Sequence, residues 1–176
     1  MKVLKIINIF LLLIICHSLS AQKYISKEGT ISFFSETPLE NISAVNKNVS
    51  AVYDLASSDL VFQLDIEKFI FPIALMQEHF NENYLESDIY PKSKFIGSVV
   101  NIIDEQATVS GDLTIHGITK SIKVVGSFIK SKNSVLINSQ FIIKLKDYNI
   151  KIPKIVMYKI AEEIEVRVSI ELTELR

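Results

Sequence analysis

The chain has 176 residues, of which 48% are hydrophobic, 22% charged and 9% aromatic. This composition excludes a disordered chain, collagen and a coiled coil, and the length fits one folded domain. Nineteen Lys and Arg stand against twenty Asp and Glu, which gives a formal net charge of -1. Because there is no basic excess to attract a phosphate backbone, we expect no nucleic-acid partner.

Residues 1–21 have the form of a secretory signal peptide. Two lysines precede an apolar run over residues 6–15, and small residues lead to Ala21. The run is shorter than the ~18 apolar residues that a membrane span needs. We therefore expect cleavage after Ala21, no stable membrane insertion of the mature chain, and a periplasmic or secreted location.

Cys16 is the only cysteine of the chain. A lipoprotein attached through Cys16 is the alternative to cleavage after Ala21, but the bulky Ile15 directly before it argues against lipidation. Cleavage would leave one domain, residues 22–176, without a thiol. Such a domain needs no disulfide and cannot use thiol catalysis or a cysteine-containing zinc site.

Most of the mature chain alternates apolar and polar residues, which is the period of strands with one buried face. Eight strands are predicted, at residues 30–35, 49–54, 60–67, 95–103, 109–115, 122–128, 135–145 and 164–172. Turn-forming residues separate most of them, at 56–59, 104–106, 116–119 and 131–133. Consecutive strands joined by tight turns indicate an antiparallel meander.

The period changes over residues 72–85, where apolar side chains recur three and four positions apart. Pro72 suits the first turn of a helix, so one helix is predicted at about 72–85. A second, short helical turn is predicted around Leu39 to Val45. Residues 146–161 show no clean period and are interpreted as a long loop, either a simple connector or a cover over the second mouth of a barrel.

Eight long antiparallel strands in an open sheet would leave two exposed edges, and closure into a barrel removes both. The predicted fold is therefore all-β, an antiparallel eight-stranded barrel with the helix at about 72–85 capping one mouth. A two-sheet sandwich is the alternative, because the same alternation supports it.

Two segments resemble the YceI family. Residues 75–95 place His79 ahead of an acidic, aromatic stretch that ends in Tyr90-Pro91-Lys92-Ser93-Lys94-Phe95, and residues 111–120 read Gly-Asp-Leu-Thr-Ile-His-Gly-Ile-Thr-Lys. Both match the family in order and spacing, and the resemblance covers the mature chain. It implies an exported, lipocalin-like barrel whose members include binders of long polyisoprenoid chains.

The chain also departs from this family. Met76-Gln77-Glu78-His79-Phe80 stands where the family commonly has Arg-Asp-x-His-Leu, so the polar pair before the histidine is absent. The usual aromatic-rich first strand is reduced to Phe33 and Phe34. The chain resembles a shorter, divergent branch of the family, which lacks any headgroup contact that the polar pair provides.

An apolar lumen would favour a long apolar ligand, because each methylene moved out of water contributes about 0.8 kcal/mol. With the resemblance, this predicts a non-catalytic protein that holds a polyisoprenoid, an isoprenoid quinone or a similar lipid, without a cofactor. The predicted ligand-binding residues are Phe33, Phe62, Phe69, Leu75, Met76, His79, Phe80, Tyr84, Phe95, Leu113, Ile115, Phe128 and Phe141. The alternative is a barrel filled by its own side chains, an interaction or structural protein of the envelope. A homodimer is left open.

The two histidines of the mature chain are interpreted structurally. His79 is expected to be a capping residue bonded to backbone rather than a headgroup contact, and His116 a solvent-facing turn residue. A metal-dependent enzyme would need both within about 5 Å of a shared carboxylate. They belong to separate elements, and the chain has no HExxH, nucleophile-elbow, phosphate-loop or dinucleotide motif. No metal site and no catalytic residue are therefore predicted.

Overall fold

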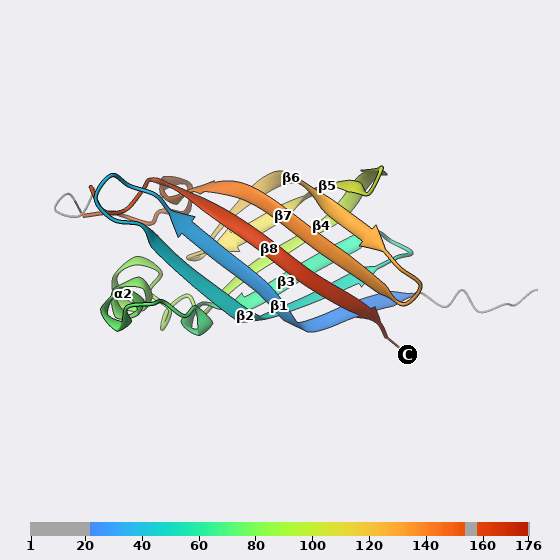
Figure 1. Ribbon diagram of the computed structural model, residues 1–176, viewed down its shortest axis with the longest axis horizontal. Coiled ribbons are helices and arrows are strands. Elements are labelled where there is room, and N and C mark those ends of the chain that lie inside the picture. The colour runs from blue at the N-terminus through green and yellow to red at the C-terminus, as the bar shows by residue number, and fades with distance from the viewer. Residues whose placement is uncertain (1–21, 154–157, 176) are drawn as a thin grey trace, which may run out of the picture.

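Eight strands form one closed antiparallel barrel in a computed structural model, which describes residues 22–153 and 158–175. Each strand pairs with its neighbour in the sequence, and β8 closes the barrel by pairing with β1 (Figure 1). The barrel prediction is confirmed, and the sandwich alternative is excluded. The predicted signal peptide, with Cys16, lies outside the described residues.

The strands run in sequence order around the barrel. Their bounds are β1 Lys23–Ser35, β2 Ile42–Asp54, β3 Asp59–Asp65, β4 Lys92–Ile103, β5 Gln106–Ile115, β6 Ile118–Lys130, β7 Ser134–Lys144 and β8 Glu163–Glu174. Every predicted strand is present, but β1 and β2 begin seven residues earlier than expected. Register shifts on both sides of Gly29 interrupt the alternation of β1, which hid its first half from the sequence pattern.

The helical turn predicted around Leu39 to Val45 is wrong. Ile42 to Val45 belong to β2, where Ala44 pairs with Phe33 of β1 and Val45 forms a bridge to Ile70. Ladder hydrogen bonds to a neighbouring strand outweigh the weak local preference for a helix after Pro38. The helix predicted at about 72–85 is confirmed as α2 (Ala74–His79), continued by the π-helical turn η2 (Phe80–Tyr84). No helix in the described residues is long and apolar enough to cross a bilayer.

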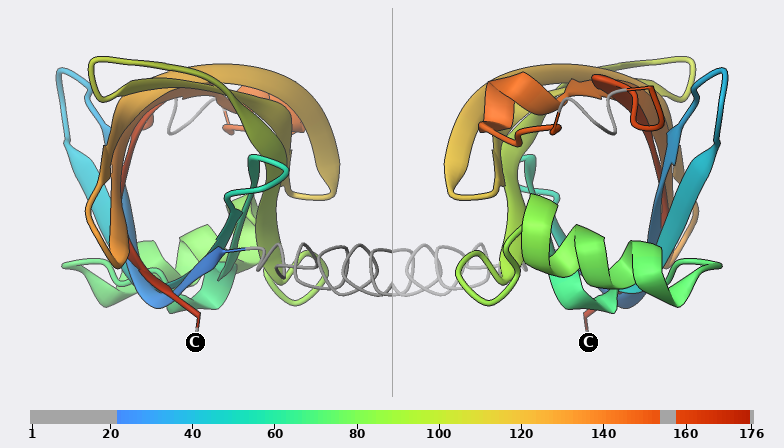
Figure 2. Two further views of the ribbon diagram at one scale, coloured as in Figure 1. Left: turned by 90° about the vertical axis from the view of Figure 1, so that its right-hand side faces the viewer. Right: turned by 90° about the vertical axis from the view of Figure 1, so that its left-hand side faces the viewer.

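Alternate connections lie at opposite ends of an up-and-down barrel. The connections after β1, β3, β5 and β7 share one end, here called the mouth, and those after β2, β4 and β6 share the other, the closed end. α2 therefore lies at the same end as residues 145–153 and 158–162 (Figure 2). The expectation that 146–161 could cover a second mouth is wrong, because the antiparallel order of the strands returns this connection to the helix end.

Buried side chains close the other end of the barrel. Tyr24, Tyr53, Val135 and Leu172 are at most 3% exposed and pack in one cluster. The ring of Tyr53 meets Phe128 edge to face at 5.1 Å between centroids. Burial raises the pKa of the Tyr53 phenol, so this plug carries no charge near neutral pH. Among the described residues, this plug closes the barrel at the end opposite the mouth.

Gly29 makes room for Ile170 in this plug, since a Cβ at Gly29 would lie 2.7 Å from Ile170 Cγ1. We expect Gly29→Ala to lower the free energy of unfolding by about 1–3 kcal/mol through overpacking, and Ile170→Ala to lower it by about 2–5 kcal/mol through a cavity. The double variant should lose less free energy of unfolding than the two single variants together, because the methyl group added at position 29 occupies space that Ile170→Ala leaves empty. Urea unfolding of the four proteins measures this, and strictly additive losses would contradict the proposed contact.

Candidate binding site

The barrel encloses a cavity of about 600 Å³. This volume lies within the range of about 300–1,000 Å³ that is usual for small-molecule sites. Its lining includes Leu75, His79 and Lys159, which are exposed at the mouth, so the cavity opens there. At the other extreme it ends on Leu60 and Phe128, which belong to the buried plug. The cavity is thus a blind tube with one entrance.

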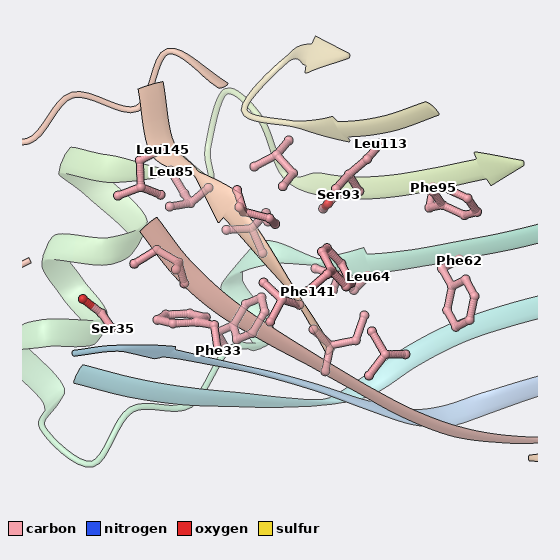
Figure 3. Close-up of a pocket in the computed structure, with 18 of the residues that line it drawn as sticks. Phe33, Ser35, Phe62, Leu64, Leu85, Ser93, Phe95, Leu113, Phe141 and Leu145 are labelled. Atoms are coloured by element: carbon pink, nitrogen blue, oxygen red, sulfur yellow. The ribbon is translucent and has the colours of Figure 1, made fainter. Parts of the chain in front are cut away.

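Every strand contributes to the wall of the tube, mostly through alternate side chains, although β2 supplies only Ile42. On β7 the inward positions run from Ile137 through Phe141 to Ile143, which corresponds to roughly 20 Å of strand. Figure 3 shows Phe33 and Phe141 close to the helix, whereas Phe62 and Phe95 lie farther from it. The length of the tube suits an elongated molecule better than a compact one.

A pair of glycines shapes the wall between β4 and β5. Gly97 and Gly111 are paired across these strands. A Cβ atom would lie 2.6 Å from Phe95 Cζ if placed on Gly97 and 2.8 Å from it if placed on Gly111. The Phe95 ring therefore lies over the two glycines instead of over side chains. A larger residue at either position would collide with the ring and the neighbouring backbone, so the pair lets a large aromatic ring lie close to the wall.

Four phenylalanines hold the helix over the mouth. Phe80 of η2 stacks on Phe33 of β1 at 5.5 Å between ring centroids and contacts Phe69 at 5.5 Å and Phe71 at 5.0 Å. Aromatic pairs of this geometry add about 0.5–1.5 kcal/mol each beyond their buried area. The cluster fixes one face of the helix against the lumen. Burial there also raises the pKa of the Tyr84 phenol, which keeps it neutral near pH 7.

Hydroxyl groups in the wall already have backbone partners. Ser93 Oγ donates to the Thr114 carbonyl at 2.9 Å, Ser139 Oγ donates to that of Val125 at 3.4 Å, and Ser35 Oγ accepts from the Ala161 amide at 2.9 Å. The ionisable Asp, Glu, His and Lys side chains of the lining are each at least partly exposed, and they are Glu40, His79, Lys94 and Lys159. The wall of the tube is therefore mainly apolar, and these three serine hydroxyls are already engaged by backbone.

All of the predicted ligand-binding residues line this cavity. The strands bring together Phe33, Phe62, Phe95, Leu113, Ile115, Phe128 and Phe141, and the connection from β3 to β4 adds Phe69, Leu75, Met76, His79, Phe80 and Tyr84. Their contact with a ligand stays a prediction. The sequence reasoning missed further lining residues that share the same inward register, among them Ile31, Leu64, Ile122, Ile137, Ile143, Ile164 and Val166.

His79 does not have the role expected for it. Its side chain is exposed at the entrance of the cavity, and its imidazole forms no hydrogen bond within the described residues. The capping interaction with backbone is therefore wrong. The reason is the position of His79 at the end of α2, where its side chain is exposed at the cavity entrance and has no backbone carbonyl as a partner among the described residues. It remains free to contact a polar group at the entrance.

His116 is also placed differently, because it is buried and not solvent-facing. It has a φ of 50°, and Nε2 lies 2.6 Å from Glu86 Oε2 while Nδ1 lies 3.2 Å from the Tyr148 carbonyl oxygen. Tyr90 packs against the ring at 4.5 Å between centroids. Glu86 and the carbonyl are both acceptors, so both bonds form fully when each ring nitrogen carries a hydrogen. His116 thus joins three segments of the mouth.

This junction compensates for a gap in the barrel. Pairing between β6 and β7 stops at Gly126 and Ser139, although both strands continue toward the mouth. The 3₁₀ turn η3 (Leu145–Tyr148) follows β7, and Tyr148 and Ile150 are buried against the lumen residues. These side chains replace the missing backbone ladder, and the bond from His116 to Tyr148 fixes them to the β5–β6 turn.

A metal site of the kind considered from the sequence is not formed by the described residues. No three His, Cys, Asp or Glu side chains among them come close enough to hold a metal ion. His116 is engaged by Glu86, and the exposed His79 lies at the cavity entrance. The arrangement that the enzyme alternative required, two histidines around one carboxylate, is therefore not observed.

We expect His116→Ala to lower the free energy of unfolding by about 2 kcal/mol, because the Tyr148 carbonyl loses a buried partner. Glu86→Gln should cost less than about 1 kcal/mol, since the Glu86 carboxylate is 43% exposed. Hydrogen exchange should rise in residues 86–90 and 145–150 of His116→Ala while the amides of the closed end stay protected. Uniform acceleration over the whole barrel would contradict a local role.

Solved structures with the same architecture include proteins of three organisms. A polyisoprenoid binding domain from Saccharophagus degradans, implicated in plant cell wall breakdown, aligns with a TM-score of 0.75 and 12% identity over 89% of this chain and 100% of that one. BcnA of Burkholderia cenocepacia aligns with a TM-score of 0.72 and 16% identity, covering 81% and 95%. A YceI protein of Campylobacter jejuni gives 0.66 and 20%, covering 80% and 89%. At these identities the likeness establishes the fold.

Sequence comparison extends this likeness. No curated protein matches the chain at a significant level. Residues 22–172 match the YceI-like domain, and this match covers β1 to β7, β8 as far as Leu172, the capping helix and all of the residues that line the cavity. The resemblance seen in the two motifs is confirmed, and the chain belongs to the YceI-like domain family.

Proposed function

We propose that this protein is an exported, non-catalytic carrier that holds one long apolar molecule, a polyisoprenoid or similar lipid, in its barrel lumen. The observation that carries the proposal is the blind apolar tube of about 600 Å³. Membership of a family that includes a polyisoprenoid binding domain supports the chemical class. The form of residues 1–21 supports export.

The lumen favours the tail of a ligand over its headgroup. Each buried methylene contributes about 0.8 kcal/mol, so ten would contribute roughly 8 kcal/mol before the ligand's lost freedom is subtracted. The inward-facing hydroxyls of Ser93 and Ser139 are already bonded to backbone. A polar headgroup therefore fits best at the entrance, where His79 and Lys159 are exposed. Chain length should determine affinity more than the identity of the headgroup.

The filled-core alternative requires a lumen occupied by the protein's own side chains. The aromatic residues of the wall instead pack against one another, as Phe33 does with Phe69 and Phe80, or over glycines, as Phe95 does. They leave the centre of the tube vacant. This arrangement favours a binding protein over a purely structural one.

A ligand should accompany the protein when it is purified from its native source. Native mass spectrometry is expected to show an added mass, and organic extraction should recover a long-chain apolar molecule, because an empty apolar tube is a high-affinity environment for such chains. A protein that is purified without any such molecule and fails to bind added prenyl alcohols would contradict the proposal.

Narrowing the tube should shorten the chain that it accepts. Val168 lines the cavity in β8, whereas the neighbouring Ser169 is exposed. We expect Val168→Phe to displace about two methylenes of a long prenyl alcohol from the tube. The binding free energy should weaken by about 1.6 kcal/mol, which raises the Kd more than tenfold. Shorter prenyl alcohols should bind almost as before. Ser169→Phe is the matched control, and an equal loss in both variants would contradict binding in the lumen.

A further inference from the structure

The two ends of the barrel differ in their exposed apolar residues. At the closed end, the turns at 55–58, 104–105 and 131–133 carry no large apolar side chain that is mostly exposed, and the residues that flank them add Ile103 at 62% and Leu175 at 55%. The connections of the mouth carry several that are at least half exposed, namely Leu39, Ile70, Ile73, Leu75, Ile89 and Tyr158. Exposed apolar side chains gathered at one end of a protein indicate an interaction surface.

Four of these residues border the entrance and are called the rim: Leu39, Ile73, Leu75 and Tyr158. Ile73 and Leu75 also line the cavity, so one side of the rim continues directly into the apolar wall. On the other side, the loops of Leu39 and Tyr158 are joined by an ion pair between their neighbours Glu40 and Lys159, at 3.7 Å. The rim is therefore a defined border and not a set of scattered side chains.

Local hydrogen bonds support the exposed position of Leu39. The Thr37 hydroxyl accepts from the Glu40 amide at 3.2 Å and donates to the Glu40 carbonyl at 2.8 Å. This closes a turn in which Leu39 is 68% exposed, the same fraction as Tyr158. Tyrosine, with an apolar ring and a polar hydroxyl, is the residue type that favours the boundary between lipid and water.

The charges of the mouth restrict the kind of surface that the rim can approach. Of the described residues, 36–41, 66–91, 145–153 and 158–162 together contain nine Asp and Glu against four Lys. A surface with negative lipid headgroups would repel this excess of carboxylates, whereas a zwitterionic surface would not. Apolar side chains arranged as a border around an opening, with charges between them, also fit a deformable lipid surface better than a protein interface, whose apolar centre is continuous.

We infer that the rim docks the mouth of the barrel onto a lipid surface that carries little negative charge, as a peripheral and reversible contact. The physical reason is the cost of exposing an apolar ligand to water, about 0.8 kcal/mol for each methylene. Contact between the rim and a bilayer gives such a ligand a continuous apolar path between lipid and lumen. Docking itself does not require a bound ligand.

Co-sedimentation with phosphatidylcholine vesicles that contain no isoprenoid tests this inference. We expect the purified protein to bind these vesicles, and phosphatidylglycerol in the vesicles to weaken binding at low salt. Leu39→Ser with Tyr158→Ser should reduce the partition coefficient about tenfold, because two partly inserted side chains are lost. Neither residue lines the cavity, so binding of a prenyl alcohol in detergent should stay unchanged.

Val100→Ser with Ile103→Ser is the matched control, since both residues are exposed on β4 away from the mouth. An equal loss in this control, stronger binding to anionic vesicles, or no binding to vesicles of any composition would overturn the docking inference. Val168→Phe separates the two proposals, because it should dock like the unmodified protein. If the unmodified protein docks onto vesicles but binds no prenyl alcohol, only the carrier function is contradicted.

Discussion

The binding site depends on one packing constraint. A closed barrel turns about half of every strand's side chains inward, and it can hold a ligand only if these side chains leave space among them. Large rings occupy that interior, yet Phe95 lies over the Gly97–Gly111 pair and Phe33 packs within a cluster near the mouth. The closed end is filled by Tyr24, Tyr53 and their neighbours. The vacancy is thus confined to one tube that opens at the mouth, and this geometry determines which molecules the barrel can hold.

The mouth is less regular than the barrel because two interactions of side chains replace backbone pairing there. Phe80 anchors the helix through its contacts with the other phenylalanines of the cluster, and His116 ties the β5–β6 turn to Tyr148 where β6 and β7 have separated. Elements that depend on few contacts open more readily than a strand ladder does. Movement at this end would therefore admit a ligand without disturbing the plug at the other.

Much of the fold could be predicted from alternation alone, because inward and outward positions in Ile164 to Leu172 differ clearly in polarity. The helix spacing from Pro72 was equally informative. The first half of β1 was missed because register shifts around Gly29 break the period, and His116 was misplaced because its partners, Glu86 and Tyr148, are thirty or more residues away. The residues that line the cavity could be predicted from the alternation of inward and outward positions along each strand. The vacant volume could not, because it depends on how Phe95 packs over two glycines of neighbouring strands, and no local sequence pattern indicates that contact.

The most direct test of the account is to locate an added apolar chain within the protein. In methyl-labelled protein titrated with a long prenyl alcohol, the NMR signals of Ile122, Ile137 and Ile143, which line the lumen, should shift. Those of Ile96 and Ile142, which are exposed on the outer wall, should not. Shifts confined to the outer isoleucines, with the lumen signals unchanged at saturation, would contradict a ligand-binding barrel.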